Sequence, residues 1–200
     1  AQEYVCGKPS SDSVIGNGHA ARAVAANEQL VGETWAGAEG FRYVGNITPL
    51  ADERCGMIKM AEGIVAGLGL FGSNGVDFLQ TPRGPVVVEV NSRFQGSLDA
   101  VEKATGLNIF QAHLESFAGD LPRRPCPRSA FGRAIIYAGR DTEISEDLRS
   151  IGDWIADVPR PGSRMSKGEP ILSILAEAVA GTRSTQSSMR GGADLQENCV

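Results

Sequence analysis

The most restrictive pattern in this sequence is a pair of short strands joined by a tight turn. We expect the first strand over 75–80 and the second over 85–91, because both are rich in β-branched and other apolar residues. The four residues 81–84, Thr-Pro-Arg-Gly, separate them. Pro82 suits the second position of a turn and Gly84 suits its exit, so the pattern predicts a β-hairpin.

The second strand of this hairpin is expected to have two chemically different faces. Side chains alternate along a strand, which predicts a core face of Val86, Val88 and Val90. The same alternation places the following residues on the opposite face: Val87, Glu89, Asn91 and, if the extended conformation persists, Arg93. That second face presents a carboxylate, an amide and a guanidinium in a row.

The partner strand adds a second acid. With a connection of four or five residues, Asp77 is expected opposite Val88 or Glu89. Two carboxylates and an amide would then reach the same ion, and Mg²⁺ commonly takes one or two protein carboxylates. We therefore predict Asp77, Glu89 and Asn91 as metal ligands and Arg93 as an anion-binding residue.

Composition places the chain among ordinary soluble globular proteins of 200 residues, with 42% hydrophobic and 22% charged residues. A net charge of −5 gives no reason to expect a nucleic acid or an anionic membrane as partner. No apolar run approaches the roughly 20 residues of a membrane span, and no signal peptide is visible. Four cysteines without Cys-x-x-Cys spacing indicate reduced thiols, so a cytoplasmic location is expected.

The remaining elements predict an α+β fold. Expected strands cover 2–6, 11–15, 20–30 (with a short helix as the alternative), 130–137, 154–156 and 170–175. Expected helices cover 52–66 with Asp52 as N-cap, 98–104 and 108–117, while 7–10 and 16–18 are expected turns. The Pro- and Arg-rich segment 121–128 is expected to be a linker, and 181–200 is expected to be disordered. Because a strand is expected from the start of the chain, without a lead-in element, we also expect the chain to be a fragment of a longer protein.

The acid, turn, Glu-x-Asn and arginine of the hairpin resemble the end of the nucleotide site in the ATP-grasp superfamily. The resemblance implies that Glu89 bridges two Mg²⁺ ions and that Asp77 and Asn91 each complete one. It also implies the C-terminal lobe of that fold, an antiparallel sheet with helices, over 1–120. A small β-rich module would follow over 121–180, and the disordered tail would complete the chain. The sequence looks closest to proteins described as predicted ATP-dependent carboligases and to biotin-carboxylase-like relatives.

The first residues, Gln-Glu-Tyr-Val-x-Gly over 2–7, resemble the strand between the lobes whose main chain pairs with adenine. The resemblance thus implies nucleotide contacts from Glu3, Tyr4 and Val5. Leu79 resembles the apolar residue under the adenine, with plain core packing as an equal alternative. Two departures are visible, since 8–11 lacks the acid that often binds ribose and 96–97 (Gly-Ser) lacks the glutamate of biotin carboxylases.

The resemblance implies an ATP- and Mg²⁺-dependent ligase of the carboxylate-amine or carboxylate-thiol type that forms an acylphosphate. Arg93 would hold the substrate carboxylate or stabilise charge on the transferred group. The partners would be small carboxylates and amines, with a homodimer left open and Mn²⁺ as an alternative ion. The full-length protein is expected to be the enzyme and this segment alone to be inactive. Two alternatives stay open: a biotin-carboxylase-like carboxylase and a nucleotide-binding module without turnover.

Overall fold

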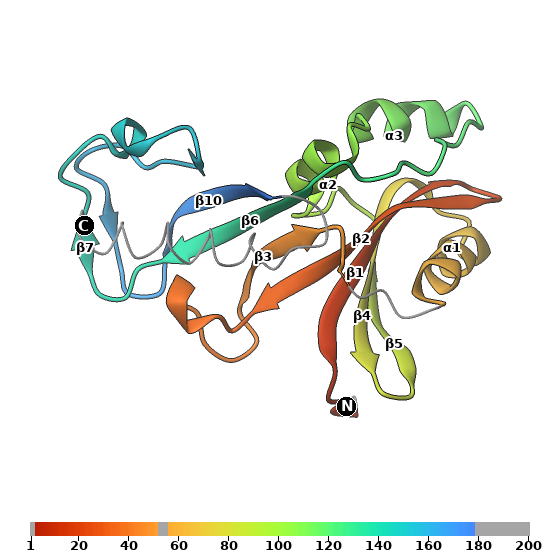
Figure 1. The fold of residues 1–200 in the computed structure, drawn as a ribbon, viewed down its shortest axis with the longest axis horizontal. Helices are drawn as coiled ribbons and strands as arrows, with labels where there is room; N and C mark the ends of the chain where they lie inside the picture. Colours follow the sequence, from red (N-terminus) through yellow and green to blue (C-terminus); the bar gives the residue numbers. More distant parts are fainter. Residues whose placement is uncertain (1–2, 52–55, 179–200) are drawn as a thin grey trace.

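The computed structural model describes residues 3–51 and 56–178. Its regular elements, in chain order, are β1 (Lys8–Asn17), β2 (Ala21–Val31), the 3-10 turn η1 (Thr34–Ala36), β3 (Tyr43–Thr48), α1 (Met57–Gly67), β4 (Phe71–Thr81), β5 (Gly84–Asn91), α2 (Leu98–Thr105), α3 (Ile109–Phe117), β6 (Ala130–Tyr137), β7 (Thr142–Glu143), the 3-10 turn η2 (Leu148–Ile151), β8 (Ile155–Ala156), β9 (Arg164–Met165) and β10 (Pro170–Ala178). The α+β class expected from the sequence is confirmed (Figure 1).

One antiparallel sheet of eight strands forms the frame of the molecule. Its strand order is β5-β4-β1-β2-β3-β6-β10-β8, and β7 pairs with β9 in a separate two-stranded ribbon. The predicted hairpin is therefore the edge of the sheet, with β5 outermost and β4 pairing with β1. An edge strand leaves one side of its backbone and much of its side-chain surface accessible, which suits a binding site.

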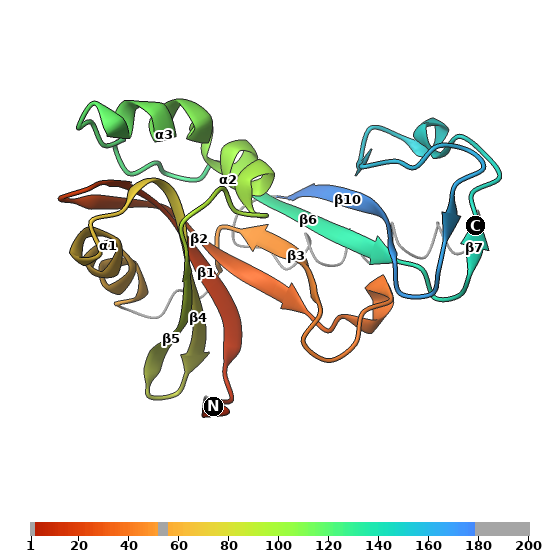
Figure 2. The ribbon, with the colours of Figure 1, turned by 180° about the vertical axis from the view of Figure 1, so that it is seen from behind.

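The helices cover opposite faces of the strands around β1 (Figures 1 and 2). Val14 and the next residue, Ile15, point to different faces. On the first face, Val14 packs with Met57 and Val65 of α1. On the second, Ile15 packs with residues of α2 and α3. α1 covers only the first face. The parts of the second face that α2 and α3 do not cover are therefore available for a binding site.

The expected hairpin of β1 and β2 is present, and the strand alternative for 20–30 is confirmed. The Asn17 side chain closes its turn by accepting from the amides of His19 and Ala20. The expected strand at 2–6 is wrong for the described residues 3–6, which form no regular element, and the expected turn at 7–10 is wrong because β1 begins at Lys8. Pro9 is tolerated there since it pairs with Leu79 of β4, while pairing with β2 starts only at the next residue.

The helices lie close to their expected positions. α1 begins at Met57 after Gly56, and the expected N-cap Asp52 lies outside the described residues. The break between α2 and α3 is confirmed: Gly106 adopts the left-handed conformation and Asn108 caps α3 by accepting from the Gln111 amide. In residues 3–51 and 56–178, no helix has the length and the apolar character that crossing a membrane would need.

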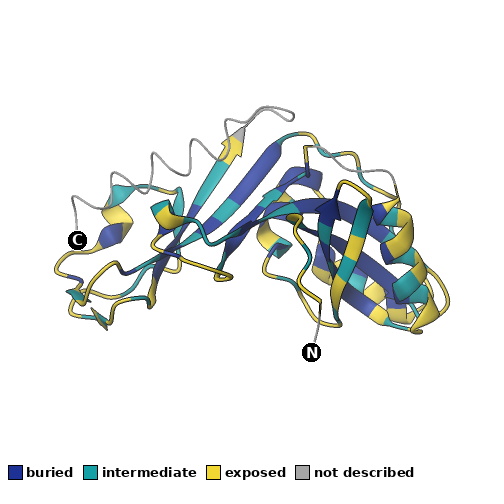
Figure 3. Cartoon of the chain, turned by 90° about the horizontal axis from the view of Figure 1, so that it is seen from below, coloured by how far each residue is buried: buried dark blue, intermediate teal, exposed yellow. Residues whose placement is uncertain are grey.

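The expected strands after the linker are confirmed, and they join the same sheet. β6 pairs with β3 on one side and with β10 on the other, and β8 adds two residues at the far edge. Figure 3 shows the buried residues running along the central strands, with exposed residues on the helices and in loops. The segment 121–128 contains no regular element, in agreement with a linker. The predicted domain limits stay predictions, and the predicted disordered tail, 181–200, lies outside the described residues.

Two glycine-to-alanine changes test this architecture. A Cβ on Gly45 of β3 would lie 1.9 Å from the carbonyl oxygen of Arg133 in β6, so Gly45→Ala should push these strands apart. We expect a loss of about 1–3 kcal/mol in the free energy of unfolding. Gly63 lies inside α1 with no atom near its Cβ position, so Gly63→Ala should stabilise by about 0.5–1 kcal/mol.

Urea unfolding of both variants measures the difference. Equal unfolding midpoints for Gly45→Ala and the parent chain would show that β3 and β6 are not this close.

Candidate active site

Asp77 and Glu89 lie directly opposite one another in the pairing of β4 with β5. We call them the acidic pair. The predicted register is confirmed, but a β-bulge accompanies it: Asp77 pairs with Glu89 and the next residue, Phe78, pairs with Val87, so that Val88 is an extra residue. A bulge of this kind reverses the alternation of faces for the residues before it in the strand, here Val87 and Val86.

The bulge corrects the predicted core face of β5. Val90 packs on the core as expected, but Val87 packs there too. Val86 and Val88 are exposed by 38% and 41%. Strict alternation would have buried these two valines. The extra residue instead turns Val87 inward and leaves Glu89 beside Asp77.

Two side-chain amides hold the acidic pair. Asn91 Nδ2 donates to Asp77 Oδ2 over 3.2 Å and to Glu89 Oε1 over 2.9 Å. On the other side, Gln29 Nε2 of β2 donates to Asp77 Oδ1 over 2.9 Å. The three predicted metal-binding side chains are therefore within hydrogen-bonding reach of each other, and Gln29 is a partner that the sequence did not indicate.

The acidic pair carries unfavourable charge. Burial, followed by the neighbouring charge of Glu89 and a hydrogen bond shared with it, raises the pKa of Asp77 to about 6. Among the described residues, no cluster of three or more His, Cys, Asp or Glu side chains forms a metal site. Two carboxylates with one amide are nevertheless a set of hard oxygen donors that suits Mg²⁺, which keeps water and phosphate oxygens as its other ligands. The donors present therefore fit a divalent cation.

Arg93 reaches the site by a different path from the one predicted. β5 ends at Asn91, and the Arg93 amide donates back to the Asn91 carbonyl oxygen, so the extended strand does not continue through Arg93. Its guanidinium nonetheless returns to Asn91 Oδ1 at 3.3 Å. Gln95 ties this turn together, since its Nε2 donates to the carbonyl oxygens of both Asn91 and Arg93.

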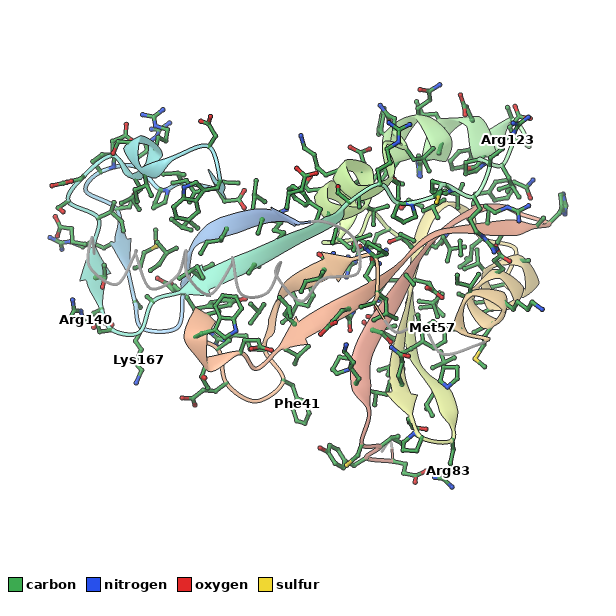
Figure 4. All side chains as sticks on the ribbon, viewed as in Figure 1. Phe41, Met57, Arg83, Arg123, Arg140 and Lys167 are labelled. Carbon is green, nitrogen blue, oxygen red and sulfur yellow. The ribbon has the colours of Figure 1, made fainter. Side chains whose placement is uncertain are left out.

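The residues predicted to contact the nucleotide lie at the turn end of the hairpin. Gly7 packs so closely on Leu79 that a Cβ there would be 2.9 Å from the Leu79 Cβ. Tyr4 is exposed and its ring lies 6.4 Å from that of Phe41, edge to face. Figure 4 labels Phe41 and, in the β4–β5 turn, Arg83, at the end of the molecule where the chain starts. Gly7, two residues after Val5, thus lies against Leu79, and the roles of Glu3, Tyr4, Val5 and Leu79 stay predictions.

Next to the acidic pair, the same face of the sheet carries a buried polar layer that sequence reasoning missed. We call it the polar floor: Ser11 of β1, Asn27 of β2, and Asn46 and Thr48 of β3. Asn27 donates to Ser11 Oγ over 3.3 Å, Thr48 donates to Asn27 Oδ1 over 2.6 Å, and Asn46 donates to Thr48 Oγ1 over 3.1 Å. The amides at alternate positions 27 and 29, after the apolar run 23–26, were the available signal.

Arg133 of β6 lies at the far end of the polar floor, opposite Asn46. Its guanidinium binds Asp99 of α2 over 2.6 Å and Asp157 over 2.5 Å. Only the assembled sheet brings it to the face of the acidic pair, because it follows the linker and lies more than 40 residues from the hairpin in sequence. The face therefore runs from two acids, across neutral amides and hydroxyls, to an arginine.

The repulsion in the acidic pair predicts that Glu89→Gln stabilises the protein in the absence of metal. A raised pKa means that the folded chain favours the protonated Asp77, so its stabilising contribution is complete below pH 4 and is lost as the pH rises through about 6. Burial is the largest cause of the raised pKa and stays, but Glu89→Gln removes the neighbouring charge that raises it further. We expect a gain of about 1 kcal/mol at pH 7, discounted for solvent screening, and none at pH 3.5.

Urea unfolding in EDTA at both pH values measures this effect, with Glu177→Gln on β10 as the matched control. Added Mg²⁺ should stabilise the parent chain and not Glu89→Gln. A variant that is less stable than its parent at pH 7 in EDTA would contradict the repulsion.

Comparison with known proteins finds a family match in the first half of the chain. Residues 1–97 match the family model described as ATP-grasp domain. An uncharacterised protein of Methanocaldococcus jannaschii is 28% identical over 178 residues, which cover 88% of this chain and 42% of the relative. The chain thus spans less than half the length of this curated relative.

Solved structures share the fold at low sequence identity. The L-amino acid ligase of Bacillus licheniformis has a TM-score of 0.72 at 16% identity, over 96% of this chain and 53% of its own. Phosphoribosylglycinamide synthetase of Anaerococcus prevotii reaches 0.73 at 14%, over 98% and 53%. The biotin carboxylase domain of a single-chain bacterial carboxylase reaches 0.71 at 16%, over 90% and 45%. The predicted fold is confirmed, and the match over residues 1–97, just under half of the chain, supports the predicted resemblance to the ATP-grasp superfamily.

Proposed function

We propose that this chain supplies the metal-binding and phosphate-binding part of an ATP-dependent ligase that joins a small carboxylate to an amine or a thiol. The observation that carries the proposal is the acidic pair held by Asn91 at an accessible edge of the sheet. A merely structural pair of acids would be expected to have a cationic partner. In the described part of the chain, amides rather than ion pairs hold these two carboxylates.

Asp77, Glu89 and Asn91 would hold Mg²⁺, with Glu89 between two ions and the other two side chains completing one each. When bound, the metal supplies neutralisation of the triphosphate charge and alignment of the γ-phosphoryl group. Asn91 now turns its Nδ2 toward the acids and its Oδ1 toward Arg93. A half-turn of the amide would bring its oxygen to the metal side.

The proposed reaction has two steps. In the first, a substrate carboxylate oxygen forms a bond to the γ-phosphorus of ATP and the bond to the β,γ-bridging oxygen breaks, so that ADP leaves with the electron pair. In the second, the amine nitrogen or thiol sulfur attacks the acyl carbon, the carbon–oxygen bond to phosphate breaks, and the nucleophile loses a proton. Arg93 is exposed beside Asn91, where its charge would stabilise the transferred group or hold the carboxylate.

The position that carries a glutamate in biotin carboxylases favours the ligase over the carboxylase alternative. Ser97 stands there, is almost fully buried and shares a hydrogen bond of 3.3 Å with Ser13. It offers no carboxylate that could act as a base on bicarbonate. Similarity to an L-amino acid ligase and to phosphoribosylglycinamide synthetase is compatible with joining a carboxylate to an amine. The second alternative, a nucleotide-binding module without turnover, is tested by the ADP-release screen described next.

An ADP-release screen of the natural protein that contains this chain tests the proposal. The protein is incubated with Mg²⁺-ATP and with pools of carboxylates, amines and thiols, each pool alone and in combination. We expect release that needs a carboxylate pool and falls by at least about 100-fold in Glu89→Gln, because a metal ligand is lost.

Glu177→Gln serves as the control and should retain the parent rate. ADP release as fast in Glu89→Gln as in the parent protein would refute the metal assignment. Release that depends on bicarbonate alone would favour the carboxylase, and no release with any pool, despite binding of Mg²⁺-ATP, would favour the module without turnover.

A further inference from the structure

A second β-bulge brings Tyr43 to the face of the sheet that carries the acidic pair. In the pairing of β2 with β3, Leu30 lies opposite Gly45 and Val31 lies opposite Tyr43, so that Val44 is an extra residue. Val44 is fully buried in the core. Its neighbour Tyr43 consequently points to the same face as Gln29 and Asn46. These two residues pair with each other, and the Leu30–Gly45 pair separates them from Tyr43.

The Tyr43 hydroxyl is poorly occupied by protein partners. Its hydrogen bond to Asn46 Oδ1 is 3.5 Å long, at the limit of such bonds. The chain at Gly96 passes beside it, where a Cβ would lie 3.5 Å from the hydroxyl oxygen. Since residue 96 has no side chain, only its backbone approaches the hydroxyl from that direction.

Charged groups surround this hydroxyl on both sides. Burial raises the pKa of Tyr43 to about 12, with Arg133 lowering it, Asp77 and Tyr137 raising it, and Arg93 lowering it. The phenol therefore stays protonated at neutral pH and can donate a hydrogen bond. It lies between the acidic end of the face and the arginine end, within the electrostatic reach of both.

The backbone of Tyr43 is held from the C-terminal strands. Tyr137 of β6 donates its hydroxyl hydrogen to the Tyr43 carbonyl oxygen over 2.7 Å. The guanidinium of Arg42 lies over the Tyr137 ring, 4.9 Å from its centroid, and also donates to the Gly168 carbonyl oxygen. The backbone that carries the donor is thus held in place before any ligand arrives, which lowers the entropic cost of using it.

We infer that the Tyr43 hydroxyl donates a hydrogen bond to the carboxylate of the acid substrate, as a specificity-determining contact. The inference rests on the proposed ligase function. An attacking carboxylate must lie next to the γ-phosphoryl group, and two anions repel each other there. A neutral donor near Arg93 holds such an anion without itself adding charge. Arg133, on the other side, is already paired with Asp99 and Asp157.

Acetate is the minimal carboxylate probe for this contact. The natural protein that contains this chain is labelled with carbon-13 at the tyrosine Cζ atoms, and Tyr43→Phe identifies the Tyr43 resonance by its loss. Sodium acetate is titrated at constant ionic strength, with and without Mg²⁺ and a non-hydrolysable ATP analogue. We expect the Tyr43 resonance to move on addition of acetate.

Affinity in the variant is measured through the line width of labelled acetate. Tyr43→Phe should weaken acetate binding by about 10- to 100-fold, because a hydrogen bond to a charged group is lost. Binding of the nucleotide analogue should be unchanged. The urea midpoint should also be unchanged, since the ring remains and only the long bond to Asn46 is removed, and this separates the contact from a structural role.

Equal acetate affinity in Tyr43→Phe and the parent protein would overturn the inference. Acetate binding through Tyr43 in a protein that fails to bind the nucleotide analogue would instead contradict the ligase function and leave the contact in place. If the protein binds the nucleotide analogue but the Tyr43 resonance does not move with acetate, the contact is refuted and the ligase proposal is left in place.

Discussion

The opposition of Asp77 and Glu89 across the β4–β5 hairpin is the constraint on which the candidate site depends. Two carboxylates that face one another in a partly buried position are costly, and the raised pKa of Asp77 expresses this cost. Amide donors from Asn91 and Gln29 reduce it without cancelling the charge. A bound cation would remove the remaining repulsion, and this is the physical basis of the proposed function.

Bulges re-aim side chains at two places on this face. In β5 the extra residue Val88 leaves Glu89 opposite Asp77, and in β3 the extra residue Val44 turns Tyr43 toward the same face. Each bulge gives up regular pairing at one position. What the sheet gains is a row of polar groups on a surface that strict alternation would have divided between its two faces.

The strands after the linker take part in the same construction. β6 pairs with β3, and this pairing brings Arg133 opposite Asn46 and the Tyr137 hydroxyl to the backbone of Tyr43. Arg133 also bridges Asp99 of α2 and Asp157, so the helical layer and the C-terminal strands meet at one guanidinium. The face between the acidic pair and Arg133 is thus made by residues from before and after the linker.

The sequence by itself determined the hairpin, the opposition of Asp77 to Glu89 and the helix break at Gly106, because each depends on residues that are close in the chain. Local turn chemistry and hydrophobic period carry such information without help from the rest of the fold. The resemblance to the ATP-grasp superfamily was also visible in the sequence, since the acid, Glu-x-Asn and arginine lie within one short segment.

Only the tertiary structure decided which valines of β5 are buried, where β1 begins, and which residues complete the polar face. A bulge depends on packing against the neighbouring strand and has no separate signature in a run of valines. Val86 and Val88 were therefore predicted to be buried and are exposed, while Val87 packs on the core. Gln29, Tyr43 and Arg133 lie far from the hairpin in the chain, and their place beside it follows from strand order. That order is set by long-range pairing, which no local pattern in the sequence encodes.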